Sequence, residues 1–386
     1  MRLLLFFTFE MSLEKWSRAG LVRHGLKFYN ELARNGIQVD LVTYAGREDY
    51  VYQPLLVPGV AVHPVFIAGP ANLWLRFFLS WLLPFRLRSL IRKSDLVKTH
   101  QMWGSWQGLA AKLLYGKKWI LRGGFEHHRA LLSEKACLRD RLFSFILSWL
   151  GYRLADAVVW SNESDLRWSV DYFGLKEADP RFQVLPNYVD TGEFRPRPAV
   201  PENRNILAVA RLDREKNLDS LLRALTGSDY HLELVGDGPL RTGLEQLAGE
   251  LSVKVGFSGR LPHEELVRRM HEARVFVLCS WYEGLPSALL EAMACGMAVV
   301  GSRVRGIREV ITDQENGLLV EPEPDSIRQG LDRLMHDNAL CEHLGRNAAR
   351  LITEKYSLEG VLRQEMSLYN RLVGFKQSPE TTAVEE

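Results

Sequence analysis

The chain has 386 residues, 46% of them hydrophobic and 25% charged, which is ordinary for a soluble globular protein. Single domains usually stop growing well below this length, so we expect two hydrophobic cores. The four cysteines have no C-x-x-C or similar spacing, which argues against a disulfide framework or a zinc site and favours a reducing, cytoplasmic compartment. The first apolar run meets Glu10 without a basic region or a cleavage site, so we expect no secretory signal.

Charge is distributed unevenly along the chain. Residues 1–190 hold 25 Lys and Arg against 17 Asp and Glu, whereas the remainder holds 24 against 30. Nine of the ten tryptophans also lie in the first half, between Trp16 and Trp168. A basic, aromatic half beside an acidic one predicts two domains that face different partners.

The first half alternates strand and helix patterns. A helix is predicted over Ser17–Arg34, where apolar and basic residues alternate at helical spacing and Asn35-Gly36 follows as a C-cap. Short apolar runs predict buried strands at Arg2–Phe9, Ile37–Thr43, Asp95–His100, Lys118–Arg122 and Ala157–Ser161. This alternation is typical of a parallel sheet covered by helices on both faces.

A proline-rich polar stretch, Arg195–Arg204, predicts a linker, and the alternation restarts beyond it. Strands are predicted at Asn205–Ala210, His231–Val235, Val253–Gly256, Val275–Ser280 and Ala298–Ser302, and the last helices at Asp325–His336, Ala339–Thr353 and Ser357–Phe375. We therefore predict an α/β protein of two doubly wound, Rossmann-like domains with a cleft between them. The predicted parts are an N-terminal domain at 1–195, a C-terminal domain at 203–355, a helix at 356–375 that packs back on the first domain, and a disordered tail at 376–386.

The composition of one segment in the first half is typical of a membrane-binding surface. Leu73–Lys93 mixes Trp, Phe and Leu with arginines, and it is too interrupted to span a bilayer of about 20 apolar residues. It could lie in a membrane interface, or it could be a core helix whose arginines extend to solvent. The basic first half favours contact with an anionic membrane surface.

The segment from Glu283 to Glu291 carries the main candidate site. A helix is expected to start near Ser287, directly after a strand and a loop, and its free N–H groups form an anion site. Glu283 and Glu291 would then accept hydrogen bonds from neutral hydroxyls, as of a sugar and a ribose. Taken alone, the pair is better explained as a capped helix start with solvated glutamates. Arg211 and Lys216 favour a binding site over this explanation, because cations at a strand's carboxyl end can clamp a diphosphate.

These residues resemble the retaining glycosyltransferases of family 4, which have the GT-B fold. The similarity rests on Arg211–Lys216, Val235–Pro239, Phe257–Arg260, Glu283–Gly296 and the hinge-like Leu185–Asp190. It implies a donor diphosphate on Arg211 and Lys216, the ribose on Glu291, the transferred sugar on Glu283 and the sugar and phosphate on the backbone of Gly284, Leu285, Pro286, Ser287 and Ala288. It implies a nucleobase near Gly259, Arg260 and Leu261. Family members need no metal, and the chain contains no Asp-x-Asp triplet.

The first half departs from the family pattern. In place of a Gly-Gly loop after the first strand stands Thr8–Gly20, in which only Gly20 is available against the donor phosphate. A histidine is usual after the strand at Lys118–Leu121, whereas His127 and His128 come a few residues later. They are either ligands near the sugar or ordinary loop histidines. Asn187-Tyr188 also stands where the family usually has Asn-Gly, so it stays an open question whether this segment acts as a hinge.

The leading hypothesis is a cytoplasmic, metal-independent enzyme that transfers a hexose-type sugar from a UDP- or GDP-sugar. The acceptor would be a glycan or a lipid-linked sugar in polysaccharide or glycolipid biosynthesis, with peripheral contact to an anionic membrane through the first half. Two alternatives stay open: a nucleotide-sugar epimerase or hydrolase, and a partner protein that binds a nucleotide sugar without turnover. Gly236-Asp237-Gly238 lacks the rest of a dinucleotide fingerprint, and the dispersed basic residues form no nucleic-acid module.

Overall fold

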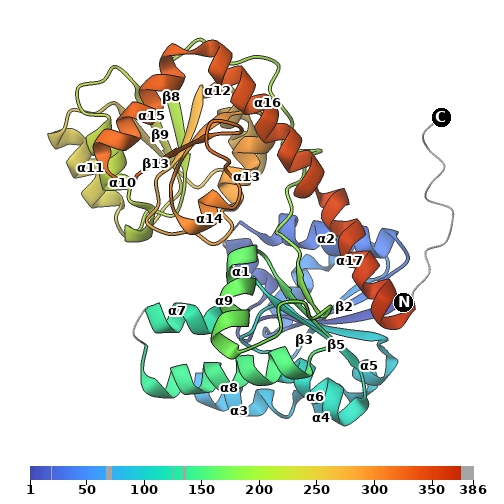
Figure 1. Ribbon diagram of the computed structural model, residues 1–386. Helices are drawn as coiled ribbons and strands as arrows, with labels where there is room; N and C mark the ends of the chain where they lie inside the picture. The colour runs from blue at the N-terminus through green and yellow to red at the C-terminus, as the bar shows by residue number, and fades with distance from the viewer. Residues whose placement is uncertain (19, 67–71, 125, 134–135, 375–386) are drawn as a thin grey trace, which may run out of the picture. The chain divides into compact units, whose positions relative to one another are not determined.

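The computed structural model describes residues 1–18, 20–66, 72–124, 126–133 and 136–374 (Figure 1). The chain forms two compact units, of which unit 1 comprises Met1–Leu185 and the chain from Leu362 on, and unit 2 comprises Pro186–Val361. The first division falls earlier than the predicted boundary at 195, and the second falls inside the last helix. The tail predicted as disordered lies outside the described residues.

Unit 1 is built on a seven-stranded parallel sheet with strand order β3-β2-β1-β4-β5-β6-β7. Five strands lie where apolar runs predict them: β1 (Arg2–Phe6), β2 (Gln38–Thr43), β4 (Leu96–Thr99), β5 (Lys118–Gly123) and β6 (Ala157–Trp160). The edge strands β3 (Val60–Pro64) and β7 (Phe182–Val184) were not predicted. They are short, and polar or proline residues interrupt them.

Helices cover both faces of this sheet (Figure 1). One face carries α2 (Val22–Arg34) and the C-terminal α17 (Leu358–Val373). The other carries α3 (Leu73–Ser80), α4 (Leu83–Arg86), α5 (Arg88–Lys93), α6 (Trp106–Tyr115) and α8 (Leu138–Leu154). The remaining elements of unit 1 are α1 (Leu13–Arg18), η1 (Arg47–Leu55), α7 (His127–Ser133) and α9 (Glu163–Phe173).

The prediction of one helix over Ser17–Arg34 was wrong. Helix α1 ends at Arg18 and α2 begins at Val22, with Gly20 between them at a φ of 76°. A left-handed backbone cannot continue a right-handed helix, and glycine adopts it without a steric penalty. The apolar periodicity on both sides of Gly20 conceals this break.

Unit 2 is built on a six-stranded parallel sheet with strand order β10-β9-β8-β11-β12-β13. Its strands are β8 (Asn205–Val209), β9 (His231–Val235), β10 (Val255–Gly259), β11 (Val275–Leu278), β12 (Ala298–Ser302) and β13 (Leu318–Val320). Strand β10 begins two residues later than the predicted strand at Val253–Gly256. It also ends later, because Gly256 lies within the strand and does not end it. Strand β13 was not predicted.

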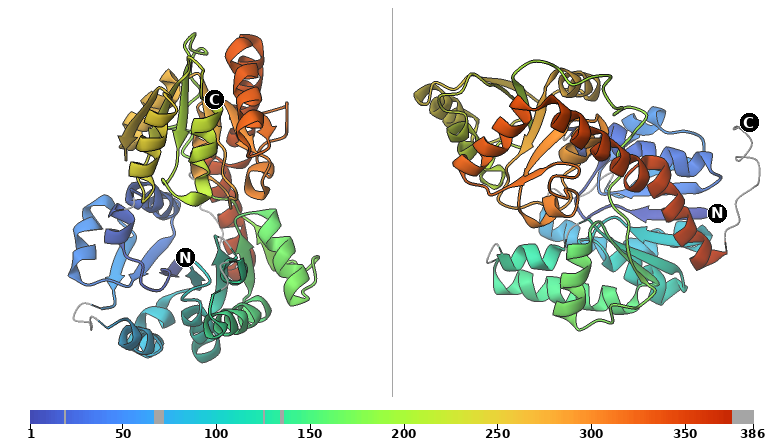
Figure 2. Two further views of the ribbon diagram at one scale, coloured as in Figure 1. Left: turned by 90° about the vertical axis from the view of Figure 1, so that its left-hand side faces the viewer. Right: turned by 45° about the horizontal axis from the view of Figure 1, so that its top comes forward.

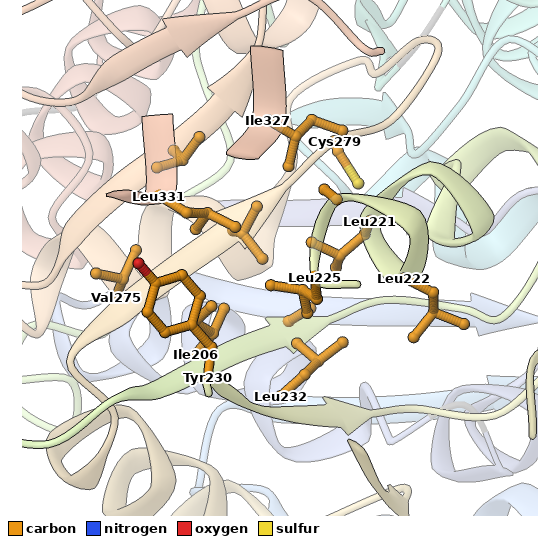
Figure 3. Close-up of a cluster of buried hydrophobic side chains, with 14 of the residues drawn as sticks. Ile206, Leu221, Leu222, Leu225, Tyr230, Leu232, Val275, Cys279, Ile327 and Leu331 are labelled. Atoms are coloured by element: carbon orange, nitrogen blue, oxygen red, sulfur yellow. The ribbon is translucent and has the colours of Figure 1, made fainter. Parts of the chain in front are cut away.

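The strands of unit 2 alternate their side chains between two hydrophobic cores. Ile206 and Val275 point to the core under α10 (Leu218–Ala224), α11 (Arg241–Glu250) and α15 (Pro324–His336), part of which is drawn in Figure 3. Leu207 and Phe276 point to the opposite core under α12 (His263–Glu272), α13 (Ser287–Ala294) and α14 (Arg305–Arg308). Helix α16 (Asn338–Lys355) contributes to both cores, and helices enclose the sheet from both sides (Figure 2).

The C-terminal helix α17 is held to the unit 1 sheet by a buried ion pair. Lys98 of β4 contacts Glu365 of α17, with side chains 3% and 1% exposed. The same Glu365 carboxylate accepts a hydrogen bond of 2.6 Å from the Tyr369 hydroxyl. A buried charge of this kind needs its partner, so α17 is an integral part of unit 1.

The stretch predicted as a linker is anchored within unit 2. The buried guanidinium of Arg197 donates hydrogen bonds to the backbone carbonyls of Ala273 and Arg274. Arg274 in turn donates to the carbonyl of Pro201 at 3.1 Å. These bonds to buried carbonyls fix a proline-rich segment that contributes little secondary structure of its own.

Candidate functional site

The loops that carry the predicted donor residues emerge at one edge of the unit 2 sheet. Strands β8 and β11 are neighbours there, while their crossovers run in opposite directions, to β9 and to β12. This reversal of strand order leaves a crevice beside the carboxyl ends of the two central strands, where open α/β sheets bind ligands. The loop after β8 holds Arg211 and Lys216, and the loop after β11 holds Glu283.

Lys216 and Glu283 form an ion pair across this point. Lys216 Nζ lies 2.7 Å from Glu283 Oε1, and Ser280 Oγ donates to the same oxygen at 2.6 Å. The side chains are only 18% and 9% exposed. The pair therefore holds both charges in a defined position at the end of the sheet. Ser280 was not identified from the sequence, although it is the last residue of the apolar run that precedes the loop.

The two loops are also joined through neighbouring residues. Asn217, with a left-handed φ of 52°, donates from Nδ2 to the carbonyls of Cys279 and Pro322 at 3.0 and 2.8 Å. The Trp281 amide donates to the Glu215 carbonyl at 2.8 Å. The Tyr282 hydroxyl bonds the Glu215 carboxylate. The single turn η2 (Arg214–Lys216) is thereby fixed against the loop after β11, and it presents Lys216 to Glu283.

Arg211 lies in the same loop as Lys216 with a different partner. Its side chain is largely exposed and pairs with Asp213, two residues further on. The hydrogen bond to Asp213 raises the pKa of Arg211 above its ordinary value. Asp213 itself is buried, and it was not predicted as part of the site. Arg211 is therefore an accessible cation at the rim of the loop, in contrast to the enclosed Lys216.

The segment Gly284–Ala288 leads into α13, whose first residue is Ser287. Pro286 occupies the N-cap position, and no side chain caps the helix. The loop is packed so closely against α14 that a Cβ on Gly306 would lie 1.8 Å from the Gly284 carbonyl oxygen. The absence of a side chain at Gly306 thus allows the backbone of α14 to pack directly against the backbone of Glu283 and Gly284. Gly306 was not predicted as part of the site, although a glycine can mark a point where another segment approaches the backbone closely.

Glu291 lies one turn into α13 and keeps part of its surface exposed. Burial of the carboxyl group, together with the charge of Glu193, raises the pKa of Glu291 to about 8. A neutral carboxyl group donates as well as accepts hydrogen bonds, which suits it to paired hydroxyls. Glu193 was not predicted as part of this environment.

The loops after β9 and β10 come to the same edge of the sheet. A Cβ on Gly236 would lie 1.9 Å from the Ala210 carbonyl oxygen, and one on Gly238 would lie 2.4 Å from that of Leu212. Both glycines therefore serve close packing against the loop after β8. Gly259 ends β10 with a φ of 65°, and Arg260 and Leu261 follow it in the loop to α12.

Unit 1 has a cavity of about 350 Å³ at the carboxyl ends of its own central strands, where the strand order reverses between β1 and β4. Trp103 and His127 lie in its wall with ring centroids 5.4 Å apart. Burial lowers the pKa of His127, so its imidazole is neutral near pH 7. The cavity is lined by Thr8, Gln101, Met102, Trp103, His127, Leu131 and Asp140.

The other first-half residues take separate positions. His128 is 2% exposed and packs among Phe145, Tyr172 and Phe173, with Nε2 3.2 Å from the Tyr172 hydroxyl oxygen. It is therefore a core residue and not a loop histidine. Gly20 lies in the turn between α1 and α2.

His100, which was not identified from the sequence, directly follows β4 and lies next to Phe7 and Trp16. Burial and the charges of Arg122 and Lys98 lower the pKa of His100 to about 3. Its imidazole is therefore neutral at any physiological pH. Over the described ranges, no group of three or more His, Cys, Asp or Glu side chains is arranged to hold a metal ion.

Two parallel, doubly wound sheets in tandem define the GT-B class of glycosyltransferase folds. The model of the glycosyl transferases group 1 matches residues 190–351, and that of glycosyltransferase family 4 matches residues 18–193. Between them they cover most of both units, so the chain belongs to the family 4, group 1 glycosyltransferases, as its motifs predicted.

Individual relatives agree with this assignment. An uncharacterised glycosyltransferase of Methanocaldococcus jannaschii is 36% identical over 54% of this chain and 55% of its own length. A Campylobacter jejuni 4-α-N-acetylgalactosaminyltransferase, named for a diphospho-undecaprenol-linked acceptor, is 31% identical over 51% of this chain and 55% of its own. The chain thus matches about half the length of these two relatives. The fold of Anabaena HepE, solved with UDP, superimposes with a TM-score of 0.76 at 17% identity, covering 96% of this chain and 100% of that one.

Proposed function

We propose that this chain transfers a hexose-type sugar from a UDP- or GDP-sugar with retention of anomeric configuration. The observation that carries the proposal is the Lys216–Glu283 ion pair at the point where the strand order of unit 2 reverses. A cation and an uncapped helix start at this sheet edge suit the diphosphate of such a donor. The carboxyl groups of Glu283 and Glu291 suit the hydroxyls of its sugar and its ribose.

Each residue then has a role in breaking the bond between sugar and phosphate. Lys216 and Arg211 neutralise the charge that develops on the leaving nucleoside diphosphate, helped by the positive end of α13. Glu283 accepts hydrogen bonds from the transferred sugar, and Glu291 binds the ribose hydroxyls. The backbone of Leu285–Ala288 contacts sugar and phosphate, and that of Gly259, Arg260 and Leu261 contacts the base. We propose that these protein groups take the place of a metal ion.

The acceptor is proposed to be a glycan or a lipid-linked sugar. The unit 1 cavity supports this, since Trp103 offers an aromatic face for a sugar ring and His127 a neutral imidazole nitrogen for a hydroxyl proton. The Campylobacter relative is named for a lipid-linked acceptor, and HepE was solved with UDP. We place the reaction at the cytoplasmic face of a membrane, where such acceptors are available.

The test is turnover of a panel of UDP- and GDP-sugars by the native chain and by Lys216→Ala. Lys254→Ala, at an exposed lysine elsewhere in unit 2, is the matched control. We expect transfer or slow donor hydrolysis by the native chain and the control, and a loss of about 10²–10³-fold in Lys216→Ala. Full activity of Lys216→Ala would contradict the proposal.

The products separate this function from its alternatives. An NMR spectrum that shows the transferred sugar with the donor's anomeric configuration supports retention. An epimerised sugar formed without acceptor would favour an epimerase. Donor binding without product, over a broad acceptor panel, would favour a partner protein that binds the nucleotide sugar without turnover.

A further inference from the structure

Exposed apolar side chains gather on one side of unit 1. Of the twenty large hydrophobic side chains that are exposed in the described ranges, thirteen come from the segment that begins with α3, from α6 and from α8. They include Trp74 and Phe78 of α3 and the tryptophan of α8, Trp149. We call this set the apolar face; it comprises Leu73, Trp74, Leu75, Phe78, Trp81, Leu82, Phe85, Leu113, Leu114, Leu138, Leu142, Ile146 and Trp149.

The apolar face has a regular basis in α8. Leu138, Leu142, Ile146 and Trp149 follow one another at helical spacing and are 41% to 77% exposed, so one side of the helix presents an unbroken apolar stripe. Beneath it, residues of the same segments pack inward, as Phe77 of α3 does against Phe143 of α8 with ring centroids 5.8 Å apart. The helices that carry the exposed apolar side chains are therefore packed against each other.

Basic groups accompany the apolar face. The segment Leu73–Lys93 contains five Arg or Lys residues and no acidic residue. Arg76 is ion-paired with Glu10, and the other four, Arg86, Arg88, Arg92 and Lys93, are exposed. Two further arginines cover exposed tryptophans, since Arg139 lies 4.9 Å from the Trp74 ring and Arg153 lies 4.4 Å from the Trp149 ring. Tryptophan beside arginine is typical of the boundary between lipid headgroups and acyl chains.

We propose that the apolar face docks unit 1 on an anionic lipid bilayer, with α3 and α8 in the headgroup region. Basic residues around apolar side chains complement negative headgroups. They disfavour a dimer through the same face, because a two-fold axis would set one basic surface against its own copy. No helix in the described part of the chain is long and apolar enough to cross a bilayer, so the contact is peripheral.

The apolar face also adjoins the cavity of unit 1. Asp140, in the first turn of α8, lines the cavity. It directly follows Leu138, which belongs to the apolar face, and Arg139, which is one of the basic residues beside that face. A lipid-linked acceptor held in the bilayer would thus present its sugar beside Trp103 and His127. This part of the inference rests on the proposed function, whereas the docking itself does not.

The test is co-sedimentation of the full chain with vesicles of phosphatidylcholine alone or mixed with phosphatidylglycerol. We expect binding to the mixed vesicles that weakens as salt rises, because salt screens the attraction between charges. Arg86→Glu/Arg88→Glu should lower the partition coefficient by tenfold or more, at about fivefold per lost arginine. Trp74→Ser/Phe78→Ser should also lower it. The matched controls Arg346→Glu/Arg350→Glu in α16 and Tyr50→Ser/Val51→Ser in η1 should bind like the native chain.

Three outcomes would overturn the proposal: no binding to mixed vesicles, equal loss in variants and controls, or a dimer in solution that the apolar-face variants dissociate. Lys216→Ala, which disables the donor site, should still bind vesicles. Vesicle binding without sugar transfer would therefore refute the proposed function alone, and transfer to a soluble acceptor without vesicle binding would refute the docking alone. Unchanged melting temperatures of the variants exclude misfolding as the cause.

Discussion

Lys216 and Glu283 lie 67 positions apart in the sequence, and their charged atoms meet at 2.7 Å. The contact joins the loops on both sides of the strand-order reversal in unit 2. The Lys216 ammonium is a compact positive charge that can bind a phosphate. The Glu283 carboxylate, which orients Lys216, can also accept a hydrogen bond from a sugar hydroxyl. This single contact therefore links the fold of unit 2 to the chemistry proposed for it.

Glu283→Gln should separate sugar transfer from nucleotide binding. The amide leaves Lys216 with a weaker partner, so affinity for UDP or GDP should be unchanged or higher. Transfer should fall about a hundredfold, because the charged acceptor for the sugar hydroxyls is lost. Calorimetry and initial rates measure the two effects, with Glu272→Gln on α12 as the control. Equal losses of affinity and rate would mean that Glu283 acts only by orienting Lys216.

Gly306→Ala should disturb the loop that carries Glu283. The added Cβ would overlap the carbonyl oxygens of Gly284 and Glu283, at 1.8 and 2.4 Å. We expect a loss of about 1–3 kcal/mol in unfolding free energy and reduced turnover. Gly243→Ala on α11, where a Cβ meets nothing within 4 Å, is the control. Thermal unfolding and donor turnover test this, and a melting temperature equal to that of the native chain would refute the close packing.

Glu291 should make stability depend on pH. Its pKa is about 8 in the folded chain against an ordinary value of 4.5, so the folded state retains a proton that the unfolded state releases. Its stabilising effect is complete below pH 4.5 and is lost as the pH rises through 8. The melting temperature of Glu291→Gln relative to the native chain should therefore rise over this window. Parallel pH profiles of the two proteins would show that Glu291 has no raised pKa.

Removal of Glu365 should weaken the attachment of α17 to unit 1. Glu365→Ala leaves the buried Lys98 ammonium without its partner, at an expected cost of about 3–5 kcal/mol. The double variant Lys98→Met/Glu365→Leu should recover most of this loss, since it removes both charges of the buried ion pair. Glu359→Ala, at an exposed position of the same helix, is the control. Denaturant unfolding measures all three, and an unaffected Glu365→Ala protein would contradict the role of the ion pair.

Much of the fold follows from local sequence patterns. Strands β9 and β12 have the predicted bounds, because local patterns define both of them: Leu232 and Leu234 alternate with polar residues in β9, and β12 begins with the apolar run Ala298–Val300. Strands β3, β7 and β13 escaped prediction, since strands of three to five residues at or near a sheet edge carry little periodic signal. The break at Gly20 was missed because apolar spacing continues on both sides of it.

The site could be predicted only in part. The residue types around Glu283 and Lys216 were recognisable, whereas their contact depends on β8 and β11 being neighbours, which the sequence order of the strands does not state. His127 and His128 are adjacent in sequence, and the start of α7 turns the first toward the cavity and the second into an aromatic core. Only the backbone conformation decides between them.

Calorimetric titration of UDP and GDP into the native chain and Lys216→Ala is the most direct test of the donor site. We expect the native chain and Lys254→Ala to bind one of these diphosphates and Lys216→Ala to bind it at least tenfold more weakly. Uridine or guanosine, which lacks the phosphates, should not distinguish the variants. Equal affinity of the native chain and Lys216→Ala for both diphosphates would contradict the assignment of the donor site.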